Sequence, residues 1–408
     1  MRSLFRNLRT TLTTTLTASS AVSKSNINMA ATTVAPTIPE FMTAVQGKDY
    51  GPIEDMLSVQ GNVKVPRLSD LPPKRQSSFI VIKTYAVALA PGDCRVLSGL
   101  TREFQGPPSF PYVPGGDCCG KVVEIPPNAK DLPFQVGDIV AARFNEKPMG
   151  ALGEYALVSS RICDKVPDTV SPEEAAALAG ATPSTLFAER IQKGERVLIL
   201  GAGGGEGSHL CQHVRNMGAG FVVGVSEDPD RLLKEPISCD RAIDYNKEDV
   251  FAMEEFRNDP FDTIIDLACG GWSRLLKQAQ DNNDKPLIVK TASQGGRFLT
   301  PSGDQPTFEI HSLWGILKPF LFVPLGRAAA TRTWKRWSLP KFTQLMGLPS
   351  SGDVMTKTLD LAKEGKLKAV IDPAGPYPFT TDGVRAAFKR QESRHGKGKV
   401  VIHVADKD

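Results

Sequence analysis

The sequence has few cysteines, and their arrangement would not form a structural scaffold. The seven cysteines among 408 residues are scattered and contain no C-x-x-C pair. This pattern excludes a small disulfide-stapled fold and is typical of a protein in a reducing compartment. A membrane-spanning run is missing as well. The most apolar stretch, Leu313 to Leu325, is short and is interrupted by one lysine and two prolines.

Acidic residues are absent from the first 39 positions. This segment has four basic residues and many Ser and Thr, and leucines recur at helical spacing (Leu4, Leu8, Leu12 and Leu16). An amphipathic, Arg-rich and acid-free leader predicts an organelle transit peptide. Its early arginines favour the mitochondrion over a plastid. Translation from Met29 would instead give a cytosolic form.

The charge of the remaining chain is balanced. The whole sequence has 49 Lys+Arg and 45 Asp+Glu. Because the leader holds four of the basic residues, the body is formally neutral, which argues against a nucleic-acid-binding surface.

Residues 310–352 also lack acids, and they carry six basic residues and three tryptophans. For the basic, aromatic stretch 311–341 we expect a pocket-lining or subunit-contact role, as in a homodimer. Peripheral contact with a membrane surface is the alternative.

The order of apolar runs predicts two kinds of domain. Short runs separated by Pro and Gly fill residues 41–175, which predicts a β-rich domain. From Glu195 strands and helices alternate, which predicts an α/β fold with a doubly wound parallel sheet. We divide the chain into a leader (1–39), a first domain (41–175), a nucleotide-binding domain (176–345) and a C-terminal segment (346–408) that could return to the first domain.

Individual elements follow from the same runs. In the first domain the predicted strands are Phe79 to Tyr85, Gly120 to Ile125, Ile139 to Ala142 and Glu154 to Ser159. Later strands are Arg196 to Leu200, Phe221 to Val225, Arg241 to Tyr245, Thr263 to Leu267, Pro286 to Thr291 and Lys399 to Val404. Helices are predicted from Ser171, over 208–217, over 353–364 and over 380–392.

The glycine-rich turn at 201–207 is the main functional motif. It follows the apolar run Val197 to Leu200 and precedes a predicted helix. Gly201, Gly204 and Gly207 recur at three-residue intervals, with Gly205 between them. Strand, glycine turn and helix place a pyrophosphate on free N–H groups at a helix N-terminus. The context therefore predicts a dinucleotide site, although the spacing departs from strict G-x-G-x-x-G.

Several further motifs carry a resemblance to a known family. They are Ala90-Pro-Gly-Asp93, Phe110 to Asp117, Val136-Gly-Asp138, Gly153-Glu-Tyr155, the glycine turn and Gly398-Lys-Val-Val401. From about residue 42 onward the chain resembles the medium-chain dehydrogenase/reductase superfamily and, within it, the zinc-less quinone-oxidoreductase branch. It looks most like the mitochondrial reticulon-interacting oxidoreductase subgroup. The resemblance implies a GroES-like catalytic domain beside a Rossmann domain.

The resemblance also bears on zinc. Zinc-dependent members carry a cysteine and a histidine at the positions that Ala90 and Gly116 occupy here, and the lobe with four close cysteines is missing. His209 and His213 lie four residues apart, but Leu210 replaces the glutamate of a zinc protease, so we interpret both as residues of a helix face. The chain is therefore expected to bind no metal.

Cofactor choice depends on the end of the second strand of the nucleotide domain. The resemblance implies that Ser226 stands at the discriminating position. With Arg231 a short way on, this favours NADPH over NADH, although Glu227 complicates the interpretation. The resemblance implies that Tyr245 contacts the adenosine phosphate. It also implies that Ser184 or Thr185 holds the nicotinamide carboxamide, and the sequence does not decide between them.

Three positions depart from the family pattern. Relatives often have an asparagine at Ala90 and a tyrosine at Leu100, so a polar group near the nicotinamide is missing and Tyr112 is left as a weak candidate for a catalytic residue. Relatives mostly have valine at Glu206. We expect its carboxylate to point to water, away from the pyrophosphate, since a negative charge there would repel the cofactor.

These observations predict an NADPH-dependent oxidoreductase that transfers hydride to a quinone or an α,β-unsaturated carbonyl. Two alternatives remain: a mitochondrial enoyl-thioester reductase, and a catalytically weak NADPH-binding partner protein, which the apolar Ala90 and Leu100 would suit.

Overall fold

The computed structural model describes residues 37–407 apart from 103–105, 108, 128–131, 144–149, 282–285, 302, 306–311 and 346–351. The predicted transit peptide therefore lies almost wholly outside the described residues. Residues 37–408 form one compact unit. Within the described part of the chain, no helix is long and apolar enough to cross a membrane.

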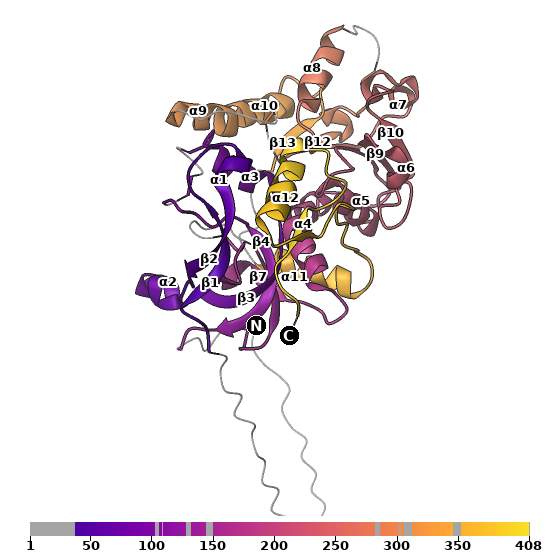
Figure 1. Cartoon of the computed structure of the whole chain (residues 1–408). Helices are drawn as coiled ribbons and strands as arrows, with labels where there is room; N and C mark the ends of the chain where they lie inside the picture. Colours follow the sequence, from indigo (N-terminus) through magenta and orange to yellow (C-terminus); the bar gives the residue numbers. More distant parts are fainter. Residues whose placement is uncertain are drawn as a thin grey trace, which may run out of the picture. The chain divides into compact units, whose positions relative to one another are not determined.

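The first domain is a mainly antiparallel sheet with an additional hairpin (Figure 1). The sheet has the order β14-β15-β3-β4-β5-β7, and β6 pairs with the same edge of β3 as β15. The strands are Phe79–Ala88 (β3), Asp117–Glu124 (β4), Ile139–Arg143 (β5), Tyr155–Ser159 (β6), Cys163–Lys165 (β7), Tyr377–Pro378 (β14) and Val401–His403 (β15); the hairpin is Phe41–Gly47 (β1) with Leu57–Lys64 (β2).

The second sheet is parallel and six-stranded, in the order β10-β9-β8-β11-β12-β13. Its strands are Arg196–Leu200 (β8), Phe221–Ser226 (β9), Arg241–Asp244 (β10), Thr263–Asp266 (β11), Arg297–Thr300 (β12) and Lys341–Gln344 (β13). Alternate residues of β8 face opposite cores, with Leu198 and Leu200 on one side and Val197 and Ile199 on the other. Burial on both faces explains why this strand is an unbroken apolar run. The two sheets together confirm the predicted α/β Rossmann fold with a β-rich GroES-like domain.

Helices connect and cover these sheets. They are Ile53–Met56 (α1), Pro73–Gln76 (α2), Pro91–Ser98 (α3), Pro172–Ala188 (α4), Gly207–Asn216 (α5), Pro229–Leu232 (α6), Glu254–Asn258 (α7), Gly271–Asp281 (α8), Leu313–Leu317 (α9), Val323–Arg332 (α10), Gly352–Lys363 (α11) and Thr381–Ser393 (α12), with a π-helical turn at Lys318–Phe322.

Helix α4 joins the two sheets. Its start is confirmed at Ser171, whose hydroxyl accepts the Glu174 N–H while the Glu174 carboxylate accepts the Ser171 N–H. Its buried alanines pack against Ala86, Ala88 and Val401 of the first sheet, while its other side contacts α5 and α11. Small side chains allow the helix to approach both layers closely.

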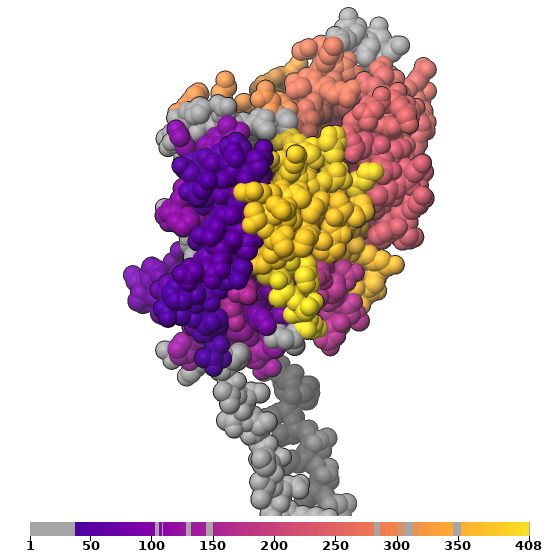
Figure 2. Space-filling model, in the orientation of Figure 1, coloured from indigo at the N-terminus to yellow at the C-terminus, as the bar shows by residue number. Residues whose placement is uncertain are grey.

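The C-terminal segment crosses from one domain to the other. Strand β15 pairs antiparallel with β3, with Val401 opposite Ala88. Helix α12 contacts β2 and α3, and Figure 2 shows this segment in yellow, lying against the N-terminal strands in indigo and the nucleotide domain in rose. Residues from the end of the chain therefore reach the middle of the molecule.

Two strands of the parallel sheet differ from the sequence prediction. The predicted strand Pro286 to Thr291 is wrong, because only Val289 pairs, in a single bridge with Phe261. Thr291 instead begins a short 3₁₀ turn, and the strand starts after Gly295 and Gly296 as β12. The strand β13 was not predicted, since its four residues include only one strongly apolar side chain, Phe342.

Phe342 offers a test of how much this short edge strand contributes to stability. Its ring is fully buried, 4.8 Å from the ring of Trp272 and 6.1 Å from that of Phe298. We expect Phe342→Ala to lower the free energy of unfolding by about 3–5 kcal/mol, measured by urea denaturation. Phe322→Ala, at a ring that is 48% exposed, is the matched control and should change it little; equal losses would contradict this placement.

Candidate cofactor-binding site

The glycine turn lies at the carboxyl end of β8, in the middle of the parallel sheet. Gly201 has a φ of +80°, and a Cβ at Gly207 would lie 2.2 Å from the Gly201 carbonyl oxygen. Both positions therefore require glycine, for the turn and for the close approach of α5. A Cβ at Gly204 would meet nothing nearer than the same oxygen, at 3.7 Å, so that part of the turn faces open space.

The turn presents unpaired donors at the start of α5. In the described part of the chain, the N–H groups of Gly205, Glu206 and Gly207 have no hydrogen-bond acceptor. The first N–H groups of a helix are free in this way and attract anions. The site can therefore hold a phosphate group by its backbone.

The residues expected at the adenosine end lie together. The Ser226 hydroxyl accepts the Asp228 N–H at 3.2 Å, and a Cβ at Gly203 would lie 2.2 Å from that hydroxyl oxygen. Arg231 donates from Nη2 to the Gly203 carbonyl at 2.5 Å, and burial lowers the pKa of its guanidinium. The exposed Tyr245 donates to Glu227 Oε2 at 3.4 Å.

Ser184 and Thr185 lie inside α4 and are both buried. Ser184 donates to the Ala181 carbonyl oxygen at 2.6 Å. The Thr185 hydroxyl lies 2.9 Å from that of Thr358 on α11 and 3.5 Å from His213 Nε2. Both hydroxyls are thus occupied within and between helices, and a role for either at the nicotinamide stays a prediction.

Tyr112 belongs to the first domain, where its backbone bridges to Gly47. Burial, with a smaller effect from the Asp93 carboxylate, raises the pKa of its phenol above the usual range. Asp93 accepts the Ala90 N–H at 2.7 Å, and burial raises the pKa of its carboxyl to about 7. A catalytic role for Tyr112 stays a prediction.

His209 and His213 are buried members of α5 that bind neighbouring groups of the protein. His209 Nδ1 lies 2.7 Å from the Gly205 carbonyl oxygen, and its Nε2 accepts the Val370 N–H at 3.0 Å. Burial lowers the pKa of His209 to about 3 and that of His213 to about 4. Neutral His209 therefore ties the glycine turn to the C-terminal segment. No group of three potential metal ligands occurs among the described residues, and zinc independence stays a prediction.

A buried cluster of charges lies behind the glycine turn. Arg143 at the end of β5 binds Asp117 Oδ1 at 3.1 Å and the Thr182 hydroxyl of α4 at 3.0 Å. The Lys399 ammonium lies over Gly180, where a Cβ would be 2.4 Å from Nζ and 2.8 Å from Asp117 Oδ2. Burial lowers the pKa of Lys399, while Asp117 and Glu206 oppose this effect.

The Glu206 carboxylate does not point to water as expected, and its orientation away from the pyrophosphate stays a prediction. Its Oε1 atom is buried without a hydrogen-bond partner. Burial raises the pKa of its carboxyl to about 7, although Lys399 and Arg143 favour the charged form. The side chain thus joins the cluster formed by Asp117, Arg143 and Lys399.

Sequence reasoning missed most of this cluster. Asp117 and Lys399 belong to motifs that carried the family resemblance, which was the available signal for them, but their partners lie far away in the chain. Thr182 is one turn before the two hydroxyls that were predicted on α4. Arg143 had no signal, because an arginine at a strand end is usually a solvated charge.

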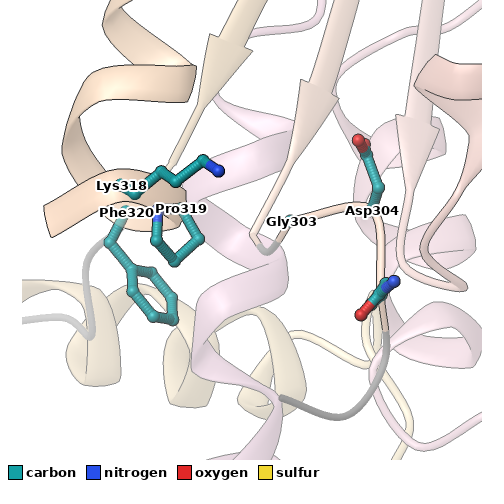
Figure 3. Close-up of a pocket in the computed structure, with 6 residues that line it drawn as sticks. Gly303, Asp304, Lys318, Pro319 and Phe320 are labelled. Atoms are coloured by element: carbon teal, nitrogen blue, oxygen red, sulfur yellow. The ribbon is translucent and has the colours of Figure 1, made fainter. Parts of the chain in front are cut away.

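A cavity lies near the carboxyl end of β12, on the side of the parallel sheet where the glycine turn follows β8. It measures about 510 Å³ and is lined by Gly303, Asp304, Gln305, Lys318, Pro319 and Phe320. Figure 3 shows Lys318, Pro319 and Phe320 on a helical segment that faces the loop of Gly303 and Asp304. Arg327 fixes the Asp304 carboxylate through two bonds of 2.9 and 2.5 Å.

The loop that follows β11 lies between the glycine turn and the loop that lines this cavity. A Cβ at Gly201 would lie 3.3 Å from the Ala268 nitrogen, in the loop after β11. In the same loop, a Cβ at Gly270 would lie 3.6 Å from the Asp304 carbonyl oxygen. Phosphate site, β11 loop and cavity therefore follow one another along the carboxyl ends of the strands, where ligands of such sheets bind.

The aromatic, basic segment 311–341 is largely exposed where it is described. Trp314, Trp334 and Trp337 are 61%, 70% and 72% exposed. Arg336 lies over the Trp337 ring at 4.9 Å. Membrane contact and a subunit contact through these side chains both stay predictions.

Comparisons with known proteins agree with this geometry. The family model of the zinc-binding dehydrogenases matches residues 237–402, and that of the alcohol dehydrogenase GroES-like domain matches residues 76–168. The chain is similar to the chloroplastic NADPH-dependent alkenal/one oxidoreductase of Arabidopsis thaliana, with 28% identity over 95% of this chain and 85% of that protein. It is 29% identical to 2-methylene-furan-3-one reductase of Solanum lycopersicum, over 92% of this chain and 82% of that one.

Solved structures show the same fold. Quinone oxidoreductase of Escherichia coli complexed with NADPH superposes with a TM-score of 0.63 at 19% identity, over 89% of this chain and all of that chain. The chain is similar to the medium-chain dehydrogenase/reductase superfamily and, within it, to proteins of the quinone-oxidoreductase-like branch. The mouse mitochondrial NAD(P)H oxidoreductase RTN4IP1 is more distant than the two plant reductases, at 26% identity over 82% of this chain and 84% of that protein.

Glu206 makes a prediction about stability against pH. Its folded-state pKa of about 7 lies above the ordinary glutamate value of 4.5, so the folded state binds the proton more tightly than the unfolded state. The stabilisation is present below the unfolded pKa and is lost as pH rises through 7. Between about pH 5 and about pH 8.5, we expect the wild type to lose about 1–2 kcal/mol more unfolding free energy than Glu206→Gln.

Urea denaturation at both pH values measures this difference. Glu248→Gln, at an exposed glutamate, is the control and should keep the wild-type pH dependence. A Glu206→Gln variant with wild-type pH dependence would show that this carboxyl titrates normally.

Proposed function

We propose that this chain is an NADPH-dependent oxidoreductase that transfers hydride to a quinone or an α,β-unsaturated carbonyl, without zinc. The observation that carries the proposal is the glycine turn with its free N–H groups at the carboxyl end of β8. A separate cavity of small-molecule size lies beside the loop that follows β12, another strand of the same sheet. The printed activities of the plant relatives, an NADPH-dependent alkenal/one oxidoreductase and a furanone reductase, support it.

Different residues at the carboxyl ends of the strands would bind different parts of the cofactor and the acceptor. The turn would bind the pyrophosphate, and Ser226 and Arg231 would lie at the adenosine ribose. When bound, the reduced nicotinamide supplies a hydride. An acceptor in the cavity would lie against Pro319 and Phe320, which exclude water from one side, while the Lys318 ammonium could attract the oxygen that gains negative charge. Ala90 and Gly116 supply no zinc ligand, so polarisation of the acceptor would depend on such groups.

Gly204 permits a direct test of the turn. A side chain there meets open space, so Gly204→Val should fold normally while blocking the phosphate position. We expect its Kd for NADPH, measured by calorimetry, to rise at least about tenfold with little change in unfolding free energy. Gly326→Ala, where a Cβ also meets nothing within 4 Å, is the control. Unchanged binding in Gly204→Val would contradict this location of the cofactor.

The acceptor is tested by NADPH oxidation in stopped flow, with a quinone, an alkenal and an enoyl-thioester as acceptors and NADH as the control. We expect turnover with the quinone or the alkenal. Activity on the enoyl-thioester alone would favour the fatty-thioester alternative. Tight NADPH binding without turnover on any acceptor would favour a binding partner protein, which the apolar Ala90 and Leu100 already suggest.

We also propose that residues 1–39 direct the protein to an organelle, preferably the mitochondrion. The acid-free leader supports import, and relatives are described as chloroplastic in Arabidopsis and mitochondrial in mouse. Residues 1–39 fused to a fluorescent protein should enter mitochondria in plant protoplasts. The same fusion with Arg2, Arg6 and Arg9 changed to Gln should stay in the cytosol. Plastid fluorescence would overturn the choice of organelle, and cytosolic fluorescence of the unchanged leader would overturn import.

A further inference from the structure

The loop at 394–398 lies beside the end of β9, although more than 160 residues separate the two in the chain. His395 Nδ1 is 2.8 Å from Glu227 Oε2, and Lys397 Nζ is 2.7 Å from Asp228 Oδ2. Each of the two acids that follow Ser226 thus faces a basic side chain from the C-terminal segment. The bond from Lys397 holds the pKa of Asp228 below its usual range.

This loop is held in place by contacts other than these two pairs. The Lys397 backbone N–H donates to Asp372 Oδ2 at 2.7 Å, and Arg390 binds the same carboxylate at 2.9 Å from Nη2 and 3.0 Å from Nε. Asp372 is completely buried. Because the backbone is anchored there, the His395 and Lys397 side chains are not needed to position the loop.

The basic side chain is the more exposed member of each pair. The side chains of His395 and Lys397 are 59% and 37% exposed, against 29% for both Glu227 and Asp228. Both basic side chains are therefore accessible to a ligand from solvent. Exposed ion pairs contribute little to stability. Stability therefore does not explain why these two pairs are present, and we consider a role in ligand binding.

Two acids at the end of the second strand would oppose NADPH. A carboxylate at this place binds the ribose diol of NADH and repels a 2′-phosphate. We propose that His395 and Lys397 set the selectivity for NADPH by engaging the carboxylates of Glu227 and Asp228 and, together with Arg231, receiving the 2′-phosphate. The inference rests on the proposed function, and it makes the C-terminal loop a specificity determinant of a site built mainly from β8 and β9.

The test compares Kd values for NADPH and NADH, by calorimetry, in the wild type and in the variants His395→Gln and Lys397→Met. We expect each substitution to weaken NADPH binding about tenfold and to change NADH binding little, since only NADPH carries the 2′-phosphate. Lys389→Met, at an exposed lysine of α12, is the matched control and should keep the wild-type ratio. The double variant His395→Gln with Glu227→Gln should recover part of the NADPH preference.

The outcomes separate this inference from the proposed function. Equal weakening of NADPH and NADH in the loop variants would assign these residues a structural role and overturn the inference. Unchanged ratios in a wild type that binds and oxidises NADPH would also overturn it and leave the proposed function intact. A wild type that binds neither dinucleotide would contradict both.

Discussion

The return of the C-terminal segment is the constraint on which the arrangement of this molecule depends. Strand β15 lies between β14 and β3 in the first sheet. The residue two positions before it, Lys399, inserts its side chain between α4, the glycine turn and β4. One stretch of chain therefore fixes the first sheet against the phosphate-binding turn. The pairing of β15 with β3 fixes the register of this stretch, and this register places the Lys399 ammonium beside α4 and the glycine turn.

The charges that meet there carry a cost. Removing Asp117, Arg143, Glu206 and Lys399 from water is unfavourable unless they compensate one another, and Glu206 Oε1 and Asp117 Oδ2 have no hydrogen-bond partner. A buried, incompletely paired cluster next to a ligand site is typical of a place where function opposes stability. The acid in the turn faces this cluster, and the N–H groups of the same turn remain available to an anion.

The same segment brings basic side chains to the end of β9. Its loop presents His395 and Lys397 to the acids that follow β9, so the segment lies both behind the glycine turn and beside the proposed adenosine site. The nucleotide domain alone would offer Glu227 and Asp228 with Arg231 as the nearby cation. If the proposed function holds, cofactor choice would depend on two distant segments, and Ser226 and Glu227 would give conflicting indications because the sequence does not show the C-terminal loop beside them.

The sequence by itself determined the elements whose signal is local. Apolar runs mark β8 and β9 because both faces of a parallel strand are buried. Ser171 and the glycines at 201–207 mark helix starts through capping and backbone geometry. Only the tertiary structure decided which distant groups meet: Glu206 with Lys399, Asp117 with Arg143 and Thr182, and the C-terminal loop with the end of β9. Hydrophobic periodicity specifies which face of an element is buried, but a side-chain charge carries no information about its partner until packing brings the two together.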